Sequence, residues 1–276
     1  MIELLKAVLY GIIEGITEWL PISSTGHMIL AEQLIRFDLS DAFMEMFRVV
    51  IQLGAILAVV VLYFKRLWPF GRDAQGRVFA KLPVWRLWFK ILLASVPAGL
   101  CILVDDKIDA WFYNYVTVAC MLILYGVLFI VIENRRIVPQ ITHVSQIGWM
   151  DAFIIGIWQM LAVIPGTSRS GATIVGGLLL GLARPCIAEF TFFLAIPAMA
   201  GASGYKMLKF FRAGNALTGQ EAMVLLVGCA VAFGVSMASI RFLMSYVKKH
   251  DFKFFGVYRI ALGLVVLAAA AVTALR

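Results

Sequence analysis

The sequence predicts an all-α polytopic membrane protein with about six transmembrane helices and two re-entrant helix pairs arranged as an inverted repeat. Composition indicates the membrane, because 62% of the 276 residues are hydrophobic, only 14% are charged, and the mean hydropathy is +0.93. Charged residues make up about 25% of an average soluble domain, so lipid is expected to cover most of this chain. Two interrupted apolar regions that resemble each other predict the rest of the architecture.

The net charge of +8 fits a membrane protein better than a nucleic-acid-binding protein. Basic residues accumulate in the cytoplasmic loops of membrane proteins. The sequence contains no zinc-ligand pattern and no lysine-rich arm, so no nucleic-acid partner is expected. The N-terminal segment carries acidic residues and lacks a small-residue cleavage site, so we expect it to remain in the mature protein.

Six apolar stretches approach the roughly 20 residues that a helix needs to cross the hydrocarbon core. These predicted spans cover residues 43–64, 88–104, 112–132, 188–208, 222–243 and 254–275.

Two further apolar regions are interrupted by polar clusters. The first runs over 7–20, meets the cluster PISSTGH and resumes at 28–36. The second runs over 152–164, meets PGTSRSG and resumes at 172–183. Pieces of this length are too short to cross a bilayer and are typical of re-entrant or buried segments.

The two interrupted regions resemble each other. GIIEGITEWLPISSTGH at 11–27 and GIWQMLAVIPGTSRSG at 156–171 share a starting glycine, a polar residue three positions later, a proline and a Ser/Thr-Gly cluster. About twenty residues after each cluster, a glutamate opens a long span, at Glu45 and at Glu189. Duplicated units often insert in opposite orientations, with their broken helices meeting near the membrane midplane.

The chain is therefore predicted to be a single integral membrane domain over 1–276, with approximate internal repeats at 1–110 and 150–245. Charge indicates which loops face inward, since most lysines and arginines outside the spans lie in four loops, at 65–90, 133–149, 184–187 and 244–253. The acidic DDKID at 105–109 and both termini would then lie outside. The basic KMLKFFR at 206–212 would also lie outside, against the rule.

The two breaks predict a shared cavity, because non-helical backbone at membrane depth must be buried in protein or line a wet space. Ionisable groups inside a membrane indicate function, and Glu14, Glu18, His27 and Arg169 lie beside the breaks. Glu14 and Glu18 project from one helical face, so a cation between them would relieve their repulsion. Mg²⁺ and Ca²⁺ prefer oxygen ligands, and Mg²⁺ commonly joins carboxylates to phosphate. The alternative is that both acids are solvated in the headgroup region.

The polar clusters themselves suit an anion. Residues 23–27 offer three hydroxyls, a glycine and a histidine, and a helix that begins there would direct its N–H groups at an anion. The guanidinium of Arg169 matches phosphate oxygens in a two-point contact. As alternatives, the first cluster or Thr167 or Ser168 could only cap a helix, and Arg169 could only pair with one of the acids. Taken together, the residues favour a phosphorylated lipid.

Four segments closely resemble the bacterial undecaprenyl-diphosphate phosphatases of the bacitracin-resistance type. They are EGITEWLPISSTGH at 14–27, VVIQLGAILAVV at 49–60, PGTSRSGAT at 165–173 and EFTFFLAIP at 189–197. The resemblance implies hydrolysis of undecaprenyl diphosphate to undecaprenyl phosphate and phosphate, which recycles the lipid carrier for cell-wall synthesis and confers bacitracin resistance. It also implies a divalent cation, Mg²⁺ or Ca²⁺, and a multi-pass protein of the bacterial inner membrane whose active site faces the periplasm or the cell exterior.

The resemblance carries roles onto matching positions. The implied catalytic residues are Glu14, Glu18, Ser24, His27 and Arg169, with Glu14 and Glu18 as the expected metal ligands. The implied substrate-binding residues are Ser23, Thr25, Gly26, Thr167, Ser168, Ser170, Gly171 and Arg259.

The residues also allow a mechanism without reference to any family. Either Ser24 or a water attacks the phosphorus, while Glu18 or His27 removes the proton of the nucleophile. Attack by Ser24 predicts a phosphoserine intermediate, and the sequence favours it slightly because the hydroxyl lies close to His27 in sequence.

One rival function stays open. Inverted repeats with broken helices are also a transporter architecture, so a flippase of undecaprenyl phosphate could use the same anion site. The acid-phosphatase-like lipid phosphatases are rejected, because their Lys-x6-Arg-Pro segment is absent from this sequence. The oligomeric state is left open, with a homodimer as one option.

Overall fold

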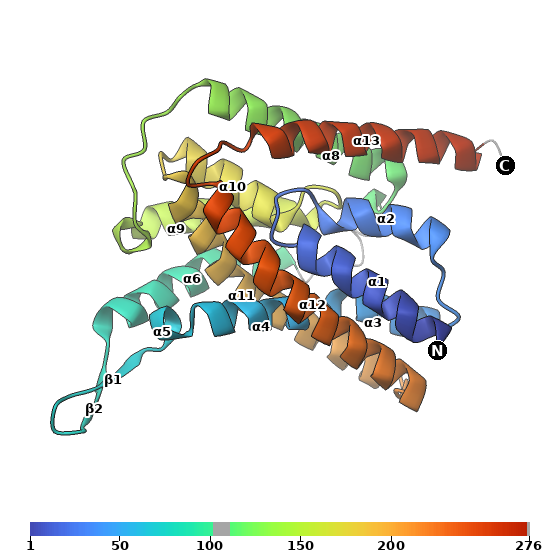
Figure 1. Cartoon of the computed structure of the whole chain (residues 1–276), viewed down its shortest axis with the longest axis horizontal. Helices are drawn as coiled ribbons and strands as arrows, with labels where there is room; N and C mark the ends of the chain where they lie inside the picture. Colours follow the sequence, from blue (N-terminus) through green and yellow to red (C-terminus); the bar gives the residue numbers. More distant parts are fainter. Residues whose placement is uncertain (102–110, 275–276) are drawn as a thin grey trace.

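Almost all regular structure in the protein is helical (Figure 1). The structure is a computed structural model that describes residues 1–101 and 111–274. Six segments of this part of the chain are long and apolar enough to cross a membrane, and each overlaps one of the six predicted spans. They are α3 (Asp41–Val50) continued by α4 (Gln52–Leu62), α6 (Leu82–Cys101), α8 (Tyr115–Asn134), α11 (Arg184–Arg212), α12 (Gly219–Tyr246) and α13 (Lys253–Ala274).

Shorter helices flank the two polar clusters, as the sequence predicted. They are α1 (Ile2–Thr17) and α2 (Ser24–Leu34) around the first cluster, and α9 (Trp149–Met160), the 3-10 turn η3 (Leu161–Val163) and α10 (Arg169–Leu179) around the second. The helix after each cluster begins earlier than predicted, at Ser24 and at Arg169. A serine directly before each helix explains the early start, because its side chain caps the first turn.

The two capping serines, Ser23 and Ser168, adopt the same rare backbone conformation. Ser23 has φ 72° and ψ 106°, and Ser168 has φ 68° and ψ 121°. A positive φ costs a residue with a side chain about 1–2 kcal/mol. Each Oγ accepts the backbone N–H of the glycine three residues later, Gly26 or Gly171. The two breaks therefore share backbone geometry as well as residue types.

Helices of the first half of the chain pack against helices of the second half. α1 lies along α12, and α9 lies along α6 (Figure 1). Glycines bring the backbones close, since a Cβ on Gly11 would lie 2.7 Å from the carbonyl oxygen of Gly228. A Cβ on Gly156 would overlap the carbonyl oxygen of Ala94. Such close approach at small residues is typical of membrane helices. α8 and α13 pair with each other and contact α2.

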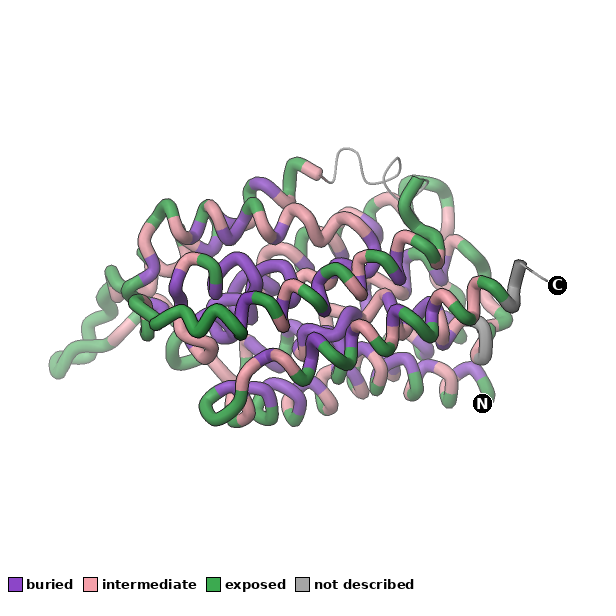
Figure 2. Tube along the Cα trace, turned by 90° about the horizontal axis from the view of Figure 1, so that it is seen from above, coloured by how far each residue is buried: buried purple, intermediate pink, exposed green. Residues whose placement is uncertain are grey.

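The long helices carry both buried and exposed positions (Figure 2), and many of the exposed positions are large apolar residues. Exposed examples are Phe89 and Leu92 on α6, Leu124 on α8, Phe242 on α12 and Leu264 on α13. A soluble monomer rarely exposes so much apolar surface. Together with the six apolar helices, this surface identifies a multi-pass membrane protein.

The loop at 65–90 contains structure that the sequence analysis did not predict. It holds the short helix α5 (Phe64–Leu67) and an antiparallel hairpin of β1 (Phe70–Arg72) and β2 (Val78–Ala80). This hairpin and the connection between α8 and α9, which includes the 3-10 turn η2 (Val144–Gln146), lie at the end of the molecule opposite both termini (Figure 1). The acidic segment at 105–109 lies outside the described residues.

Candidate active site

An ion pair joins the two breaks inside the bundle. Arg169 Nη2 lies 3.1 Å from Glu18 Oε1, and Arg169 Nη1 donates to the backbone oxygen of Thr191 at 2.9 Å. Only 12% of the Arg169 side chain and 7% of the Glu18 side chain are exposed. Of the alternatives raised for Arg169, the structure therefore contains the ion pair with Glu18. The guanidinium also keeps a free donor, because its Nε has no hydrogen-bond partner among the described residues.

Glu18 connects the arginine to the candidate nucleophile. The residue caps the C-terminus of α1, and its second oxygen, Oε2, accepts the hydroxyl proton of Ser24 at 3.1 Å. Each carboxylate oxygen of Glu18 thus contacts a residue that begins one of the helices after the breaks, Arg169 or Ser24. A carboxylate hydrogen-bonded to a serine hydroxyl has the geometry of a general base for that serine.

A cavity of about 400 Å³ opens onto this cluster. Its polar wall includes Glu18, Ser24, Thr25, Ser168 and Arg169. The facing wall comes from α6 and α11 and consists largely of small or apolar side chains, among them Ala98, Gly99, Pro197, Met199 and Gly201. A mixed polar and apolar cavity inside a membrane bundle suits a lipid with an anionic headgroup.

Glu14 lies beside the main cavity. It lines a second cavity of about 230 Å³, which shares Ser24, Thr25 and Gln52 with the first, so the two spaces adjoin. Glu14 is 1% exposed and interacts electrostatically with Glu18. Its Oε1 has no hydrogen-bond partner in the described part of the chain. This burial excludes the alternative that Glu14 is solvated in the headgroup region.

The orphaned oxygen of Glu14 fits a bound cation. A buried acceptor without a donor costs about 1–3 kcal/mol, and more when it is charged, so an ion that satisfies it is stabilised. The described residues contain no group of three or more His, Cys, Asp or Glu side chains that could hold a metal alone. Mg²⁺ commonly uses only one or two carboxylates and takes its remaining ligands from substrate phosphates and water. The donor set of Glu14 and Glu18 therefore fits a divalent cation, which they would hold together with further oxygen ligands from outside the chain.

His27 does not contact Ser24 in the structure. Its Nδ1 lies 2.7 Å from the backbone oxygen of Ser23, an acceptor, so Nδ1 carries a proton. Its Nε2 lies 2.7 Å from the hydroxyl of Tyr258, and the two rings stack at 5.7 Å. The unprotonated nitrogen of a neutral His27 is thus directed to Tyr258. This geometry favours Glu18 over His27 as the base for Ser24.

Several residues that were predicted to contact phosphate are buried within the two breaks. Ser23, Thr167 and Ser170 are at most 1% exposed, and the Ser170 hydroxyl donates to the backbone oxygen of Glu18 at 3.2 Å. Gly26 packs against Leu122, and a Cβ on Gly171 would lie 3.0 Å from Nη1 of Arg259. These residues hold the breaks in shape, and their contact with substrate stays a prediction.

Arg259 lies behind the breaks and has no exposed surface. Its guanidinium donates to backbone oxygens of both breaks, at 3.2 Å to Pro21 and at 2.9 Å to each of Gly166 and Thr167. It also donates to the oxygens of Leu122 and Met121 on α8. Arg259 does not line either of the two cavities, so its observed contacts hold the breaks in position, and its contact with substrate stays a prediction.

Substitution of Arg259 by methionine is expected to lower both stability and turnover. The buried backbone oxygens would lose their donors, at a cost of about 1–3 kcal/mol for each one left unsatisfied. The breaks would then lose their fixed separation. We expect a lower unfolding temperature in detergent and a lower kcat in the fraction that remains folded. Unchanged values of both would show that Arg259 does not hold the breaks.

Four residues near the site were missed by the sequence analysis. Tyr258 contacts His27, Thr191 accepts from Arg169, and Gln52 and Gln159 line the main cavity. Gln159 is detectable from the repeat alone, because it stands three residues after Gly156 as Glu14 stands after Gly11. Gln52 is an isolated polar residue in a predicted span, which is also a usable signal.

The chain is similar to known proteins over almost its whole length. The family model described as "Bacitracin resistance protein BacA" matches residues 7–265. A protein of Desulfitobacterium hafniense named undecaprenyl-diphosphatase is 60% identical over 273 residues, which cover 97% of this chain and 96% of the relative. Proteins of the same name from Acetivibrio thermocellus and Lactococcus lactis subsp. cremoris are each 56% identical, over 97% and 98% of both chains, respectively. This chain belongs to the BacA family of bacitracin resistance proteins.

Proposed function

We propose that the protein is an integral membrane phosphatase that hydrolyses undecaprenyl diphosphate to undecaprenyl phosphate and phosphate. The observation that carries this proposal is the position of Glu18, which contacts Arg169 and Ser24 at the wall of a cavity inside the bundle. The names of the relatives support the same substrate. The reaction would recycle the lipid carrier for cell-wall synthesis and confer bacitracin resistance.

The cavity matches the two parts of this substrate. The diphosphate would lie against Arg169 and the hydroxyls of Ser24 and Thr25. The first part of the prenyl chain would lie against Ala98 and Pro197 on the facing wall. Apolar walls also exclude water, which strengthens the electrostatic contact between arginine and phosphate.

Hydrolysis would proceed by attack of Ser24 Oγ on the terminal phosphorus. Glu18 Oε2, which already accepts the hydroxyl proton, takes that proton as the new P–O bond forms. The bond from phosphorus to the bridging oxygen breaks, and undecaprenyl phosphate leaves with the proton that Glu18 returns. A water then attacks the phosphoserine and loses its proton to Glu18, which passes it to Ser24 Oγ as the bond from phosphorus to Oγ breaks and phosphate is released. Arg169 offsets negative charge on the transferred phosphoryl group in both steps.

The two carboxylates would also hold a divalent cation, Mg²⁺ or Ca²⁺. When bound, the cation would neutralise charge on the diphosphate as it binds. The contribution of the chain is the orphaned Oε1 of Glu14, which needs a positive partner, close to the Glu18 carboxylate.

The architecture is proposed to be an inverted repeat whose short helix pairs are re-entrant. The matched conformations of Ser23 and Ser168 support it. The packing of α1 against α12 and of α9 against α6, each between the first and second halves of the chain, supports it too. Two ion pairs also connect the halves in reciprocal positions. Glu45 contacts Lys206 near the end of α11. Glu189 on α11 contacts Arg66 on α5, just after α4. Two antiparallel copies of one unit would produce such reciprocal ion pairs.

The protein is proposed to lie in the bacterial inner membrane, with its active site toward the periplasm or the cell exterior. The support is the clustering of the basic loops 65–90 and 133–149 at the end of the bundle opposite both termini (Figure 1). Basic loops favour the cytoplasmic side.

Purified protein in detergent is expected to release phosphate from undecaprenyl diphosphate when Mg²⁺ or Ca²⁺ is present. A chelator should abolish release, and Glu14→Gln should shift the metal dependence to about tenfold higher concentration, because one ligand charge is lost. The matched control is Glu221→Gln, which removes a buried carboxylate from the capping box of α12. Absence of release with either metal would contradict the phosphatase and favour the flippase.

A further inference from the structure

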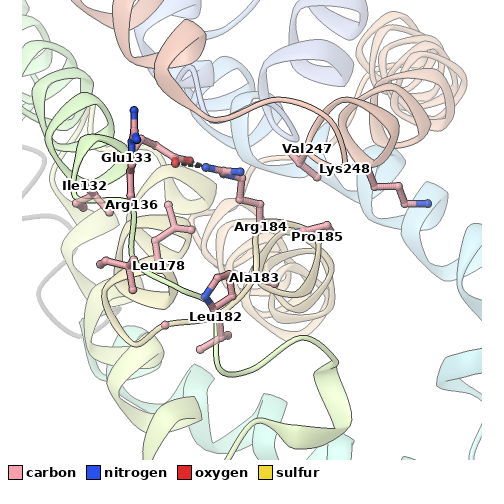
Figure 3. A pocket seen from close by; sticks show the side chains of 13 residues that line it. Ile132, Glu133, Arg136, Leu178, Leu182, Ala183, Arg184, Pro185, Val247 and Lys248 are labelled. Atoms are coloured by element: carbon pink, nitrogen blue, oxygen red, sulfur yellow. Dashed lines mark hydrogen bonds and ion pairs between the residues drawn. The ribbon is translucent and has the colours of Figure 1, made fainter.

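A separate cavity lies where α8 and α12 end and α11 begins, and Figure 3 shows the residues that line it. It has a volume of about 260 Å³, and it shares no lining residue with the two cavities of the candidate active site. We call it the Arg136 cavity. Its charged lining residues are Glu133 and Arg136 from α8 and the turn after it, Arg184 at the start of α11, and Lys248 just after α12.

Two of these four charges cancel. Glu133 is 7% exposed, and its two oxygens accept Nε of Arg184 at 2.9 Å and Nη2 at 2.5 Å. Its Oε1 also accepts the backbone N–H of Phe252 at 3.0 Å. This two-point pair, drawn with dashed lines in Figure 3, leaves the carboxylate fully occupied.

The other two charges are not neutralised. Within the described residues, neither Arg136 nor Lys248 forms an ion pair, and Figure 3 shows them on opposite sides of Arg184. A neighbouring cavity shares Lys248 and adds Arg66, but that arginine is paired with Glu189. The excess of two positive charges therefore persists across both spaces.

The backbone adds to the positive potential. α11 is a helix of 29 residues, and its cap position, Ala183, provides no side-chain hydrogen bond to the first turn. Ala183 and Arg184 both line the cavity. A helix N-terminus carries partial positive charge, which favours a phosphate, although Pro185 in this first turn has no N–H to donate. Together with Arg136 and Lys248, it makes a site for a group with at least one negative charge.

Apolar residues in the lining indicate which kind of molecule carries the negative group. Ile132, Leu178, Leu182 and Val247 also line the cavity, which lies at the end of two membrane-crossing helices. A free phosphate ion gains nothing from such walls, whereas the glycerol and upper acyl carbons of a lipid do. Basic pockets between membrane helices on the cytoplasmic side are typical sites for anionic lipid headgroups.

We propose that the Arg136 cavity binds the phosphodiester headgroup of an anionic phospholipid at the membrane surface. The excess positive charge selects a net negative lipid over a zwitterionic one. The site is independent of the proposed phosphatase chemistry, since it shares no residue with the cluster around Glu18.

The test is retention of defined lipid by delipidated protein, measured by native mass spectrometry after addition of phosphatidylglycerol. The double variant Arg136→Ala/Lys248→Ala is expected to retain about tenfold less than the unchanged protein. The matched control, Arg135→Ala/Lys249→Ala, removes the same charge from adjacent positions that do not line the cavity, and should stay within about twofold. Phosphatidylcholine should be retained weakly and equally by all three proteins.

Three outcomes would overturn the proposal. Equal loss in both double variants would show that only overall charge matters. Displacement of phosphatidylglycerol by inorganic phosphate at similar concentration would show a simple anion site. Equal retention of phosphatidylcholine and phosphatidylglycerol by the unchanged protein would show no charge selection. Unfolding temperatures of both double variants, expected to match, separate loss of binding from loss of fold.

Discussion

Replacement of Arg169 by alanine is expected to reduce kcat for phosphate release by about a thousandfold. The guanidinium contacts Glu18 and Thr191 in the resting site and lines the main cavity, where it would face a phosphate oxygen. Loss of one preorganised donor to a developing negative charge typically costs about 10²–10³ in rate. The measurement is steady-state release of phosphate from undecaprenyl diphosphate by purified protein.

Arg169→Lys should lower kcat by a similar factor, because an ammonium cannot reproduce the two-point contact of a guanidinium. Arg169→Ala also leaves Glu18 buried without its cationic partner, which costs about 3–5 kcal/mol of stability. Arg66→Ala is the control, since it breaks the ion pair with Glu189 away from the main cavity. Turnover of Arg169→Ala near that of Arg66→Ala would remove Arg169 from the catalytic site.

Replacement of Ser24 by alanine is expected to lower turnover by a factor of about a thousand or more and to abolish a covalent intermediate. Ser24 Oγ is the only hydroxyl among the described residues that donates to the side chain of Glu18. Rapid acid quenching with substrate labelled at the terminal phosphate should trap phosphoserine in the unchanged protein. No label should be trapped on Ser24→Ala.

The matched control is Thr25→Val, which removes a neighbouring hydroxyl from the wall of the same cavity while Ser24 still contacts Glu18. It should keep the labelled intermediate. If Ser24→Ala retained turnover within about tenfold, a water would be the nucleophile, and Ser24 would only position Glu18.

The spans were predictable because their signal is local. Apolar length alone determines whether a helix can cross the bilayer, and all six predicted spans overlap helices of sufficient length. The starts of α2 and α10 were predicted too late, because Ser24 and Arg169 are polar and read as part of the break. The hairpin at Phe70–Ala80 was missed, since its strands are only three residues each and carry little periodic signal.

The site was predictable in part for a different reason. Burial of a carboxylate or a guanidinium in a membrane costs free energy, so Glu18 and Arg169 were expected to belong to one functional site. The two side chains are in contact. The role of Arg259 was not predictable from its neighbours in sequence. Its partners are backbone oxygens, which every residue carries and which no residue type marks. The turning of His27 toward Tyr258 likewise depends on packing between α2 and α13.

The position of Arg259 in α13 has a consequence for biosynthesis. The oxygens that it ties together belong to Pro21 and to Gly166 and Thr167, which are translated much earlier. A ribosome-bound chain that ends before α13 would contain Glu18, Ser24 and Arg169 without the residue that sets their separation. Enzymatic competence is therefore expected only after α13 has been translated and has joined α8, and chains truncated before α13 should insert in the membrane without gaining activity.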